Sequence, residues 1–415
     1  MANGMVLTKD SLKTFVVDSA KGCVHKPEGT FHYRYVTPTI SVNPGADDVS
    51  TVPERSRVGH YLQMYDWDSC FFSQAAWRVG IDGLAFDVMR NFLSLQDKEG
   101  YIPRTVSPGR IWDAGDLCKP FLSQTCLMEY KRTQNKQYRL GPAEILGLDC
   151  YYRYFMKTRR HPLGLYHWRN VLESGIDDNL ALLSPMEAEK DENEDPGKFP
   201  DGELLATDLN AYLFAEYRAF AELCEMAGDV QKAQFYRDQA REIQELVEKY
   251  LWDEELGMYC NYHPRTKKLV KLRAWSGLCP VLFGLSTDER SARTIKTNIM
   301  NEEHFLRPSG LASLAASENL YSQSKRGLYG RVICSHWQGP MWVLPNALTA
   351  RCLLSKDLRK EASIIATSTV NTVERILQKT GTMYENYNAE TGDPLWAPDF
   401  MSWNVLLLEL LELRA

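Results

Sequence analysis

The sequence lacks any segment that could cross a membrane. No uninterrupted apolar run approaches the roughly 20 residues that a transmembrane helix requires. Residues 1–15 also contain no apolar stretch after a basic start, which a secretory signal would need. We therefore expect a protein that is neither secreted nor membrane-bound and that works in the cytoplasm.

Metal-ligand and disulfide patterns are missing as well. The ten cysteines are dispersed without a CxxC pair, and the eight histidines show neither HxxxH nor HExxH spacing. Cys70 and Cys224 lie among apolar neighbours, which favours reduced thiols in the core over a disulfide framework. The sequence also has no glycine-rich nucleotide-binding motif. We therefore expect no metal site and no cofactor.

Charge of one sign is not concentrated either. The formal net charge is −6, and the lysines and arginines are scattered rather than gathered into a stripe. Nucleic acids and anionic membranes bind surfaces that carry such a stripe. We therefore expect neither partner and predict a small-molecule substrate, with homo-oligomer formation left open.

Helical periodicity is the dominant feature that the sequence does contain. Residues 208–226 and 229–250 predict two amphipathic helices, the second with Asp229 as its N-cap. Because only two residues separate them, the helices must form an antiparallel hairpin. Strand-like alternation is brief, as at residues 257–263. Further helices are expected near residues 69–80, 84–95, 121–134, 141–158, 284–299, 345–354, 358–378 and 401–413.

This pattern predicts a mainly α protein but leaves its architecture open. Helical hairpins without a fixed repeat fit a solenoid, a bundle or a closed toroid. Loops with unusual motifs recur between helices from residue 61 to residue 403, and they must converge if they share one site. We predict one domain over residues 1–415, with residues 1–59 as an N-terminal extension packed on it. The acidic segment within 181–203 is either a solvated loop or a lid.

Aromatic residues make up 11% of the sequence, and many lie in loops beside glycine and proline. Loops rich in tryptophan and tyrosine are typical of surfaces that stack against a flat ligand. Hydrolysis of a glycosidic bond needs such platforms together with two carboxyl groups on opposite sides of the anomeric carbon. Both occur in the stretches YDWDSCF (65–71), PFLSQTC (120–126), ESGIDDN (173–179), SHWQGPMW (335–342) and MYENYNAETGDP (383–394).

Each candidate carboxyl also has a structural interpretation. Asp177 or Asp178 could cap the helix that follows ESGIDDN. Glu385 lies among tyrosines, where a buried carboxylate could be a hydrogen-bonded structural group. Single motifs therefore do not decide between catalysis and structure.

The ordered series YDWDS, ESGxD, WxGPxW and YENYNxETG resembles glycoside hydrolase family 63, in particular its compact microbial and plant members. Within the family, the mannosylglycerate and glucosylglycerate hydrolases look most similar, and the resemblance runs from about residue 60 to the carboxyl terminus. It implies an (α/α)6 barrel with its motif-bearing loops at one end. It also implies an inverting α-glycoside hydrolase that cleaves 2-O-α-mannosylglycerate or glucosylglycerate. An α-glucosidase or trehalase-like hydrolase of a short oligosaccharide is the alternative.

The resemblance also implies roles for individual residues. Asp177 matches the general acid of the family, and Glu385 matches the base that activates water on the opposite face of the sugar. Arg104 and Arg110 are candidates for contact with a glycerate carboxylate, with surface solubility as the alternative. Sugar-binding roles are implied for Tyr65, Trp67, Asp68, Gln124, Trp337, Gln338, Gly339 and Trp342.

Three departures from the family pattern stand out. Gln338 replaces the arginine of WRGPxW, so a charged contact is absent. SQPP has become SQTC, which removes two prolines that stiffen the turn. Asp178 replaces the asparagine that often follows the catalytic aspartate, and a second carboxylate there could raise the pKa of its neighbour.

Two other classes of protein fit less well. A helical-repeat binding scaffold predicts a fixed period of about 34 residues, which the sequence does not show. A carbohydrate-binding protein without catalytic activity could have lost either carboxyl, yet both are present.

Overall fold

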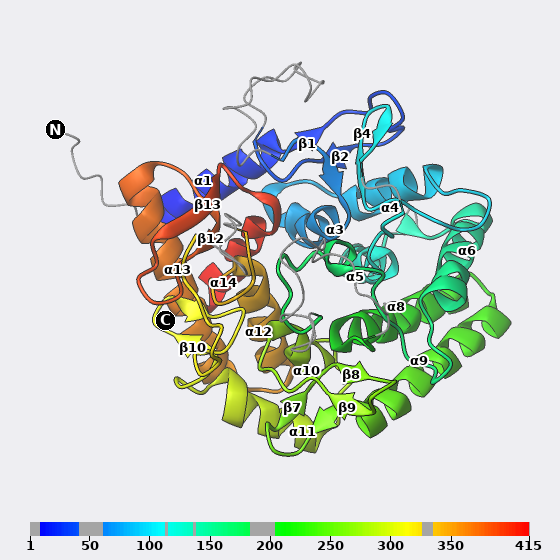
Figure 1. The fold of residues 1–415 in the computed structure, drawn as a ribbon. Helices are drawn as coiled ribbons and strands as arrows, with labels where there is room; N and C mark the ends of the chain where they lie inside the picture. Colours follow the sequence, from blue (N-terminus) through cyan, green and yellow to red (C-terminus); the bar gives the residue numbers. More distant parts are fainter. Residues whose placement is uncertain are drawn as a thin grey trace.

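The computed structural model describes residues 9–40, 61–112, 115–135, 138–182, 204–325 and 335–414. Along this part of the chain, outer and inner helices alternate around a common axis (Figure 1). The inner ring consists of α3 (Asp66–Ala75), α5 (Leu122–Thr133), α8 (Thr207–Met226), α10 (Cys279–Leu282), α12 (Val343–Ser355) and α14 (Leu407–Leu413). The outer ring consists of α1 (Lys9–Gly22), α4 (Leu84–Ser94), α6 (Pro142–Thr158), α9 (Val230–Tyr250), α11 (Asp288–Thr294) and α13 (Arg359–Thr380).

Short helical segments extend or connect these rings. A 3₁₀ helix directly precedes α10 and another directly precedes α14, and a single turn of α-helix lies between α6 and α8. These segments are η1 (Ala76–Val79), α7 (Val171–Ser174), η3 (Trp275–Leu278), η4 (Ile295–Ile299) and η6 (Ser402–Leu406). None of the helices in the described ranges combines the length and the hydrophobicity needed to cross a bilayer.

The inner ring is closed. Each inner helix packs against the next, from α3 through α5, α8, α10 and α12 to η6, and η6 packs against α3. The first and last described helices, α1 and α14, are also in contact and lie side by side (Figure 1). The predicted (α/α)6 barrel is therefore confirmed, and an open solenoid is excluded because its ends would not meet.

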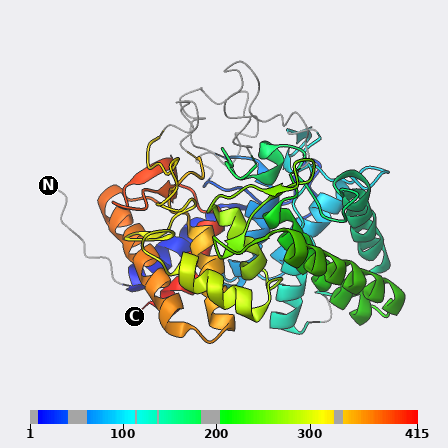
Figure 2. The same cartoon turned by 60° about the horizontal axis from the view of Figure 1, so that its bottom comes forward.

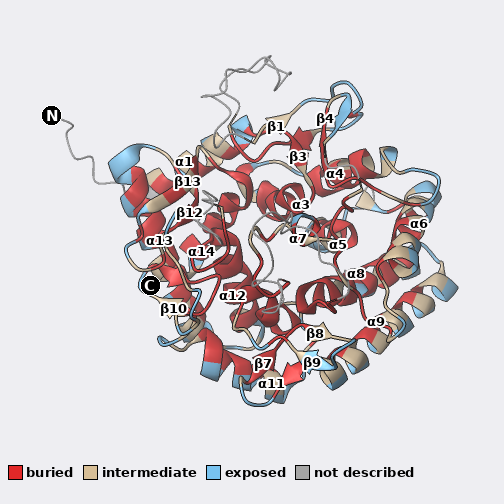
Figure 3. Cartoon of the chain, in the orientation of Figure 1, coloured by how far each residue is buried: buried red, intermediate tan, exposed pale blue. Residues whose placement is uncertain are grey.

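The α8–α9 hairpin shows how the sequence separates the two rings. Fifteen of the 20 residues of α8 are buried, whereas α9 buries a single stripe at intervals of three to four residues. A helix buried all round belongs in the interior, and an amphipathic helix covers it from outside. The Asp229 carboxylate accepts the Lys232 N–H at 3.0 Å, which confirms the predicted N-cap. The same contrast between buried inner helices and half-exposed outer helices holds around the ring (Figure 3).

The strands are short antiparallel pairs in the connections between helices. The hairpin of β12 and β13 pairs Tyr384 with Pro398 and Asn386 with Trp396. The order β3-β4-β5 makes a three-stranded sheet, and the other pairs are β1-β2, β6-β7, β8-β9 and β10-β11. The bounds are β1 (Val24–His25), β2 (Tyr35–Val36), β3 (Met64–Tyr65), β4 (Thr105–Ser107), β5 (Arg110–Ile111), β6 (Trp252–Asp253), β7 (Met258–Tyr259), β8 (Tyr262–His263), β9 (Lys268–Leu269), β10 (Leu306–Arg307), β11 (Gly310–Leu311), β12 (Tyr384–Tyr387) and β13 (Pro394–Pro398).

The helix order brings the motif-bearing loops to one end of the barrel. Since each outer helix returns the chain, successive inner helices run in the same direction (Figures 1 and 2). Their N-terminal ends therefore meet, and these ends follow Tyr65, Phe121 and Trp342 within the motifs. The N-terminal extension was expected to pack on the domain. Its helix α1 packs against η1, η6 and α14. The lid expected over 181–203 lies outside the described residues from residue 183 onward.

Candidate active site

Both predicted catalytic carboxyls line one cavity of about 270 Å³. This volume is at the low end for small-molecule sites, so it suits a single sugar ring better than an extended chain. The described residues that line it are Pro38, Tyr61, Tyr65, Trp67, Asp68, Arg104, Leu172, Gly175, Asp177, Glu385, Phe400 and Trp403. The cavity thus combines segments from the beginning, middle and end of the chain.

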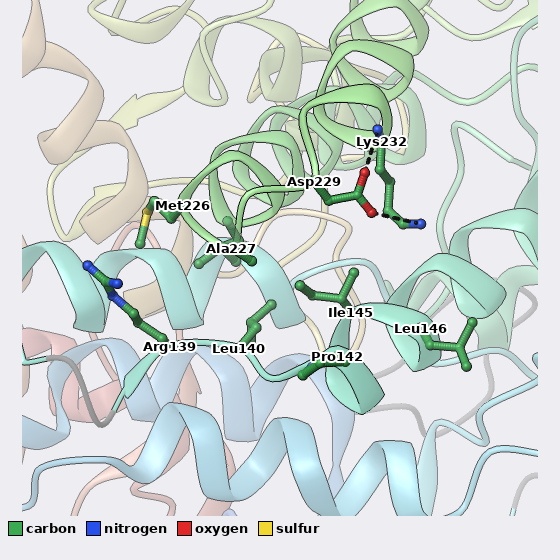
Figure 4. Close-up of a pocket in the computed structure, with 10 residues that line it drawn as sticks. Arg139, Leu140, Pro142, Ile145, Leu146, Met226, Ala227, Asp229 and Lys232 are labelled. Atoms are coloured by element: carbon green, nitrogen blue, oxygen red, sulfur yellow. Dashed lines mark hydrogen bonds and ion pairs between the residues drawn. The ribbon is translucent and has the colours of Figure 1, made fainter.

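A larger cavity of about 480 Å³ lies elsewhere, between α6 and the α8–α9 hairpin (Figure 4). Its floor is apolar, with Leu140 and Ile145, and among the described residues that line it Asp229 is the one carboxylate. That carboxylate already caps α9 and pairs with Lys232 at 3.3 Å. This cavity therefore lacks the carboxyl pair needed for acid–base chemistry, and its volume alone does not make it the active site.

Asp177 is held by the loop that follows α7. Gly175 ends α7 with φ of 73°, and a Cβ atom at this position would lie 2.6 Å from Lys119 Cε. A larger residue would therefore be both strained and crowded. The Ser335 hydroxyl donates to Asp177 Oδ2 at 2.6 Å, and the Trp337 N–H donates to the Asp177 carbonyl at 3.0 Å. Burial raises the pKa of Asp177, against the opposing effects of the Ser335 hydrogen bond and the Arg104 charge.

Glu385 lies on β12 and faces the same cavity. The Tyr61 hydroxyl donates to Glu385 Oε2 at 3.0 Å. Burial raises the pKa of Glu385 well above its usual range, and the negative charges of Asp177 and Asp68 raise it further. Two buried carboxyls that share a cavity and have raised pKa values are suited to exchange protons with a bound substrate.

Asp68 is a third carboxyl in this cavity. It lies in the first turn of α3, and the Ser402 hydroxyl donates to Asp68 Oδ1 at 2.7 Å. Burial raises the pKa of Asp68 to about 7 despite this hydrogen bond. Because the folded state holds this proton more tightly than the unfolded state does, ionised Asp68 opposes folding.

Replacement of Asp68 by asparagine is expected to raise the melting temperature at pH 8. Ionised Asp68 destabilises the fold to its full extent above the folded pKa of about 7. This destabilisation fades as the pH falls toward the ordinary pKa of 3.8. The gain should therefore be large at pH 8 and small at pH 4.5, as thermal unfolding at both pH values would measure.

Asp253→Asn provides a control of opposite sign. Burial acts to raise the pKa of Asp253, but the Leu256 N–H and the Lys271 ammonium hold this pKa below its usual range. The ionised carboxylate therefore stabilises the fold above the unfolded pKa, and this contribution is lost in acid. Asp253→Asn should lower the melting temperature at pH 8 and have less effect at pH 4.5. Equal shifts for Asp68→Asn at the two pH values would contradict the assignment of Asp68.

Two buried cations balance the acidic cavity. The Lys119 ammonium lies 3.1 Å from Asp66 Oδ2, with both side chains fully buried. It also lies 4.9 Å from the centre of the Trp67 ring, on which it makes a cation–π contact. Arg104 lines the cavity and donates to the Leu172 carbonyl at 2.5 Å. These positive charges reduce the repulsion between the carboxyls.

The tryptophans form two layers at this end of the barrel. Trp67 and Trp403 line the cavity, with their ring centroids 5.6 Å apart. Trp337 lies behind Trp67 at 5.9 Å and stacks on Trp342 at 4.4 Å with an interplanar angle of 16°. Trp67 and Trp403 therefore offer the aromatic surfaces for a ligand, and Trp337 and Trp342 support them from the core.

Gln338 and Gly339 shape the loop behind the predicted acid. The Gln338 amide donates to Asp178 Oδ2 at 3.4 Å. Gly339 has φ of 141°, and a Cβ atom there would lie 2.8 Å from the Ser322 carbonyl oxygen. Neither is among the described residues that line the cavity, so their predicted sugar contacts stay predictions.

Gln124 and Arg110 also lie outside the described cavity wall. The Gln124 amide donates to the carbonyls of Pro120 at 3.0 Å and Tyr212 at 3.3 Å, so it joins α5 to α8. Arg110 lies on β5, where its guanidinium stacks 3.6 Å from the centre of the Trp112 ring. Of the two candidate arginines, the structure brings only Arg104 to the cavity.

Several cavity residues were missed from the sequence. Tyr61 and Trp403 are aromatic residues close to the motifs. A search for aromatic residues near YDWDS and the final helix would have found them. Ser335 and Ser402 hold carboxyls through single hydroxyl groups, and nothing in a lone serine indicates such a contact. Pro38 lies outside every motif.

With this geometry in view, the comparisons with known proteins give a consistent result. Residues 61–403 match the family described as the mannosylglycerate hydrolase MGH1-like glycoside hydrolase domain. The chain belongs to this family. The resemblance to glycoside hydrolase family 63 is thereby confirmed, and the protein is a glycosidase.

Sequence relatives of this MGH1-like glycosidase are distant. The periplasmic trehalase of Pseudomonas aeruginosa is 23% identical over 406 residues, which cover 87% of this chain and 69% of the trehalase. A probable mannosyl-oligosaccharide glucosidase of Schizosaccharomyces pombe is 23% identical over 60% of this chain. The chain spans only 30% of the length of that glucosidase.

Solved structures share the barrel. The family 63 mannosylglycerate hydrolase of Thermus thermophilus, in complex with Tris and D-glycerate, has a TM-score of 0.69 at 17% identity. The similarity covers 97% of this chain and 100% of the Thermus chain. The neutral trehalase of Saccharomyces cerevisiae has a TM-score of 0.63 at 14% identity, over 99% of this chain and 81% of the trehalase.

Proposed function

We propose that this glycosidase is an inverting enzyme in which Asp177 is the general acid and Glu385 the general base. The observation that carries the proposal is the shared cavity, since the two carboxyls come from segments 208 residues apart and yet line one cavity. Each carboxyl has a hydroxyl donor, Ser335 for Asp177 and Tyr61 for Glu385. Their raised pKa values suit groups that exchange protons during the reaction.

In this mechanism the sugar ring occupies the cavity against Trp67 and Trp403, with Asp68 within reach of its hydroxyl groups. Protonated Asp177 gives its proton to the glycosidic oxygen as the bond to the anomeric carbon breaks. Glu385 removes a proton from a water molecule that attacks the opposite face of the same carbon. The free sugar leaves with inverted configuration, Asp177 is left ionised, and Glu385 carries the proton taken from water until proton exchange with solvent restores both groups.

For the substrate we propose 2-O-α-mannosylglycerate or glucosylglycerate. The family description and the Thermus hydrolase support this choice. Arg104 supports it too, because a guanidinium at the cavity can pair with the glycerate carboxylate. The trehalase relative supports an alternative, an α-glucosidase or trehalase-like hydrolase of a short oligosaccharide.

A panel of mannosylglycerate, glucosylglycerate, trehalose and kojibiose would test the proposal. We expect cleavage of a glycerate glycoside with the highest kcat/KM, and proton NMR should detect the β-anomer first from the α-linked substrate. First appearance of the α-anomer would refute inversion. Faster cleavage of trehalose or kojibiose would favour the alternative substrate class while leaving the acid and base assignments intact.

We also propose that the enzyme acts in the cytoplasm. The support is the state of the cysteines, since the nine that lie in the described ranges are all free thiols and eight of them are buried. Free buried thiols are typical of proteins in a reducing compartment.

A further inference from the structure

Pro38 is part of the cavity wall and Thr39 follows it directly, although both lie outside the matched family domain of residues 61–403. Pro38 lines the cavity, and because proline has no N–H, it leaves no unsatisfied backbone donor there. Thr39 follows it with a fully buried side chain and pairs with Phe400 in an isolated β-bridge. The N-terminal segment therefore contacts both the cavity and the C-terminal part of the ring.

The Thr39 hydroxyl holds the backbone of Tyr61 from both sides. It donates to the Tyr61 carbonyl at 3.0 Å, and it accepts the Tyr61 N–H at 3.0 Å. The Thr39 N–H adds a longer bond to the same carbonyl at 3.4 Å. The phenol of Tyr61 in turn donates to Glu385 Oε2 at 3.0 Å. A chain of hydrogen bonds thus runs from Thr39 through Tyr61 to the predicted base.

Pro38 supports the Asp68 carboxyl in a similar way. Its carbonyl accepts the N–H groups of Met401 at 2.7 Å and Ser402 at 2.9 Å, at the start of η6. The Ser402 hydroxyl then donates to Asp68 Oδ1 at 2.7 Å. These two residues of the N-terminal segment are therefore linked to two of the three carboxyls in the cavity.

We propose that Thr39 is a positioning residue of the active site, whose hydroxyl fixes Tyr61 so that the Tyr61 phenol orients Glu385. This inference rests on the proposed role of Glu385 as the general base. Thr39 acts only through Tyr61, since its hydroxyl bonds are made to the backbone of that residue.

The test compares loss of the hydroxyl with loss of the methyl group. Thr39→Val keeps the shape of the side chain but removes both hydroxyl bonds to Tyr61, whereas Thr39→Ser keeps the hydroxyl. We expect Thr39→Val to lower kcat by about 10- to 100-fold with little change in KM, because a small misplacement of a catalytic group has effects of this size. Thr39→Ser should stay within about threefold of wild type, since its hydrogen bonds remain.

The pH profile distinguishes positioning from a general weakening of the fold. A hydroxyl that donates to a carboxylate favours its ionised form, so a displaced Tyr61 should raise the pKa of Glu385. The acidic limb of kcat/KM should move to higher pH in Thr39→Val, because the base must be ionised to act. The other charges near Glu385, those of Asp177 and Asp68, are the same in every variant.

Thr369→Val is the matched control. Thr369 is equally buried and donates to the Ile365 carbonyl at 2.9 Å, but it lies on the outer helix α13. Its replacement should leave kcat and the acidic limb unchanged. In a double-mutant cycle, Thr39→Val should add nothing to the loss caused by Tyr61→Phe, since both act on one contact. Thr39→Ala replaces Thr39→Val in the series if the valine variant does not fold.

The outcomes separate this inference from the proposed function. If wild type cleaves none of the four glycosides, the proposed function fails. If wild type is active but Thr39→Val behaves like Thr369→Val, only the inference fails. Equal losses in Thr39→Ser and Thr39→Val, or full additivity with Tyr61→Phe, would also overturn it.

Discussion

Asp177→Asn and Glu385→Gln are each expected to lower kcat by about 10²–10⁴-fold, the usual contribution of one general acid or base. An asparagine at position 177 has no acidic proton to give to the leaving oxygen. A glutamine at position 385 cannot take a proton from water. Steady-state kinetics on the best substrate of the panel would measure both losses, and KM should change much less than kcat because the proposed sugar contacts with Trp67 and Trp403 remain.

Both variants should remain folded, which separates this expectation from simple inactivation by unfolding. The carboxyls are buried and their pKa values are raised, so their ionised forms oppose folding at neutral pH. The amide isosteres remove that charge and can still accept the hydrogen bonds from Ser335 and Tyr61. We therefore expect melting temperatures at pH 8 equal to or above that of wild type.

Asp178→Asn is the matched control for the acid. Asp178 is adjacent to Asp177, but it is not among the described residues that line the cavity. Its φ of 50° is a conformation that asparagine adopts readily, so the substitution introduces no new strain. kcat should stay near that of wild type. A loss in Asp178→Asn as large as that in Asp177→Asn would reverse the assignment of the acid.

The sequence was most informative about local structure. The α8–α9 hairpin and its Asp229 cap follow from periodicity and capping, because these features depend on residues within a few turns of one another. The inner helix α10 was missed. It has only four residues and contains Pro280, so no helical period could appear in the sequence.

The residues of the site were predicted only in part, because motifs identify residues but do not show how distant loops pack. Motif order indicated that Trp67, Asp177 and Glu385 belong together, and all three line the cavity. The motif WxGPxW did not show that Trp337 would lie one layer behind Trp67, since this depends on how loops from distant helices stack. The contacts of Thr39 were also beyond reach, because Tyr61 lies 22 residues away along the chain and no local pattern indicates such bonds.

Glu173→Gln should be the most destabilising single change near the site. Glu173 lies on α7, four residues before Asp177, and its side chain is fully buried. Its Oε1 accepts the Leu117 N–H at 2.9 Å and the Arg159 guanidinium at 2.6 Å. Its Oε2 accepts the Arg169 N–H at 2.6 Å. Every acceptor oxygen of this carboxylate is therefore occupied by a buried donor.

The glutamine variant replaces one of these oxygens by an NH₂ group that faces a donor, and it leaves the Arg159 charge unpaired. Removal of one partner from a buried ion pair costs about 3–5 kcal/mol. Both side chains of this pair are at most 8% exposed, so water does not screen the loss. We expect a corresponding fall in the free energy of unfolding, measured by chemical denaturation. Because α7 carries Gly175 and Asp177 into the cavity, kcat should also fall by about tenfold or more.

Glu390→Gln is the control for this prediction. Its pair with Arg307 has a similar geometry, at 2.7 Å, but the two side chains are 22% and 33% exposed. Partly exposed pairs contribute about 0–1 kcal/mol, so this variant should unfold at nearly the denaturant concentration of wild type. The double variant Arg159→Met with Glu173→Gln should recover part of the lost stability, because no charge remains unpaired, yet it should not recover kcat. Equal destabilisation by Glu173→Gln and Glu390→Gln would show that the buried carboxylate does not anchor α7.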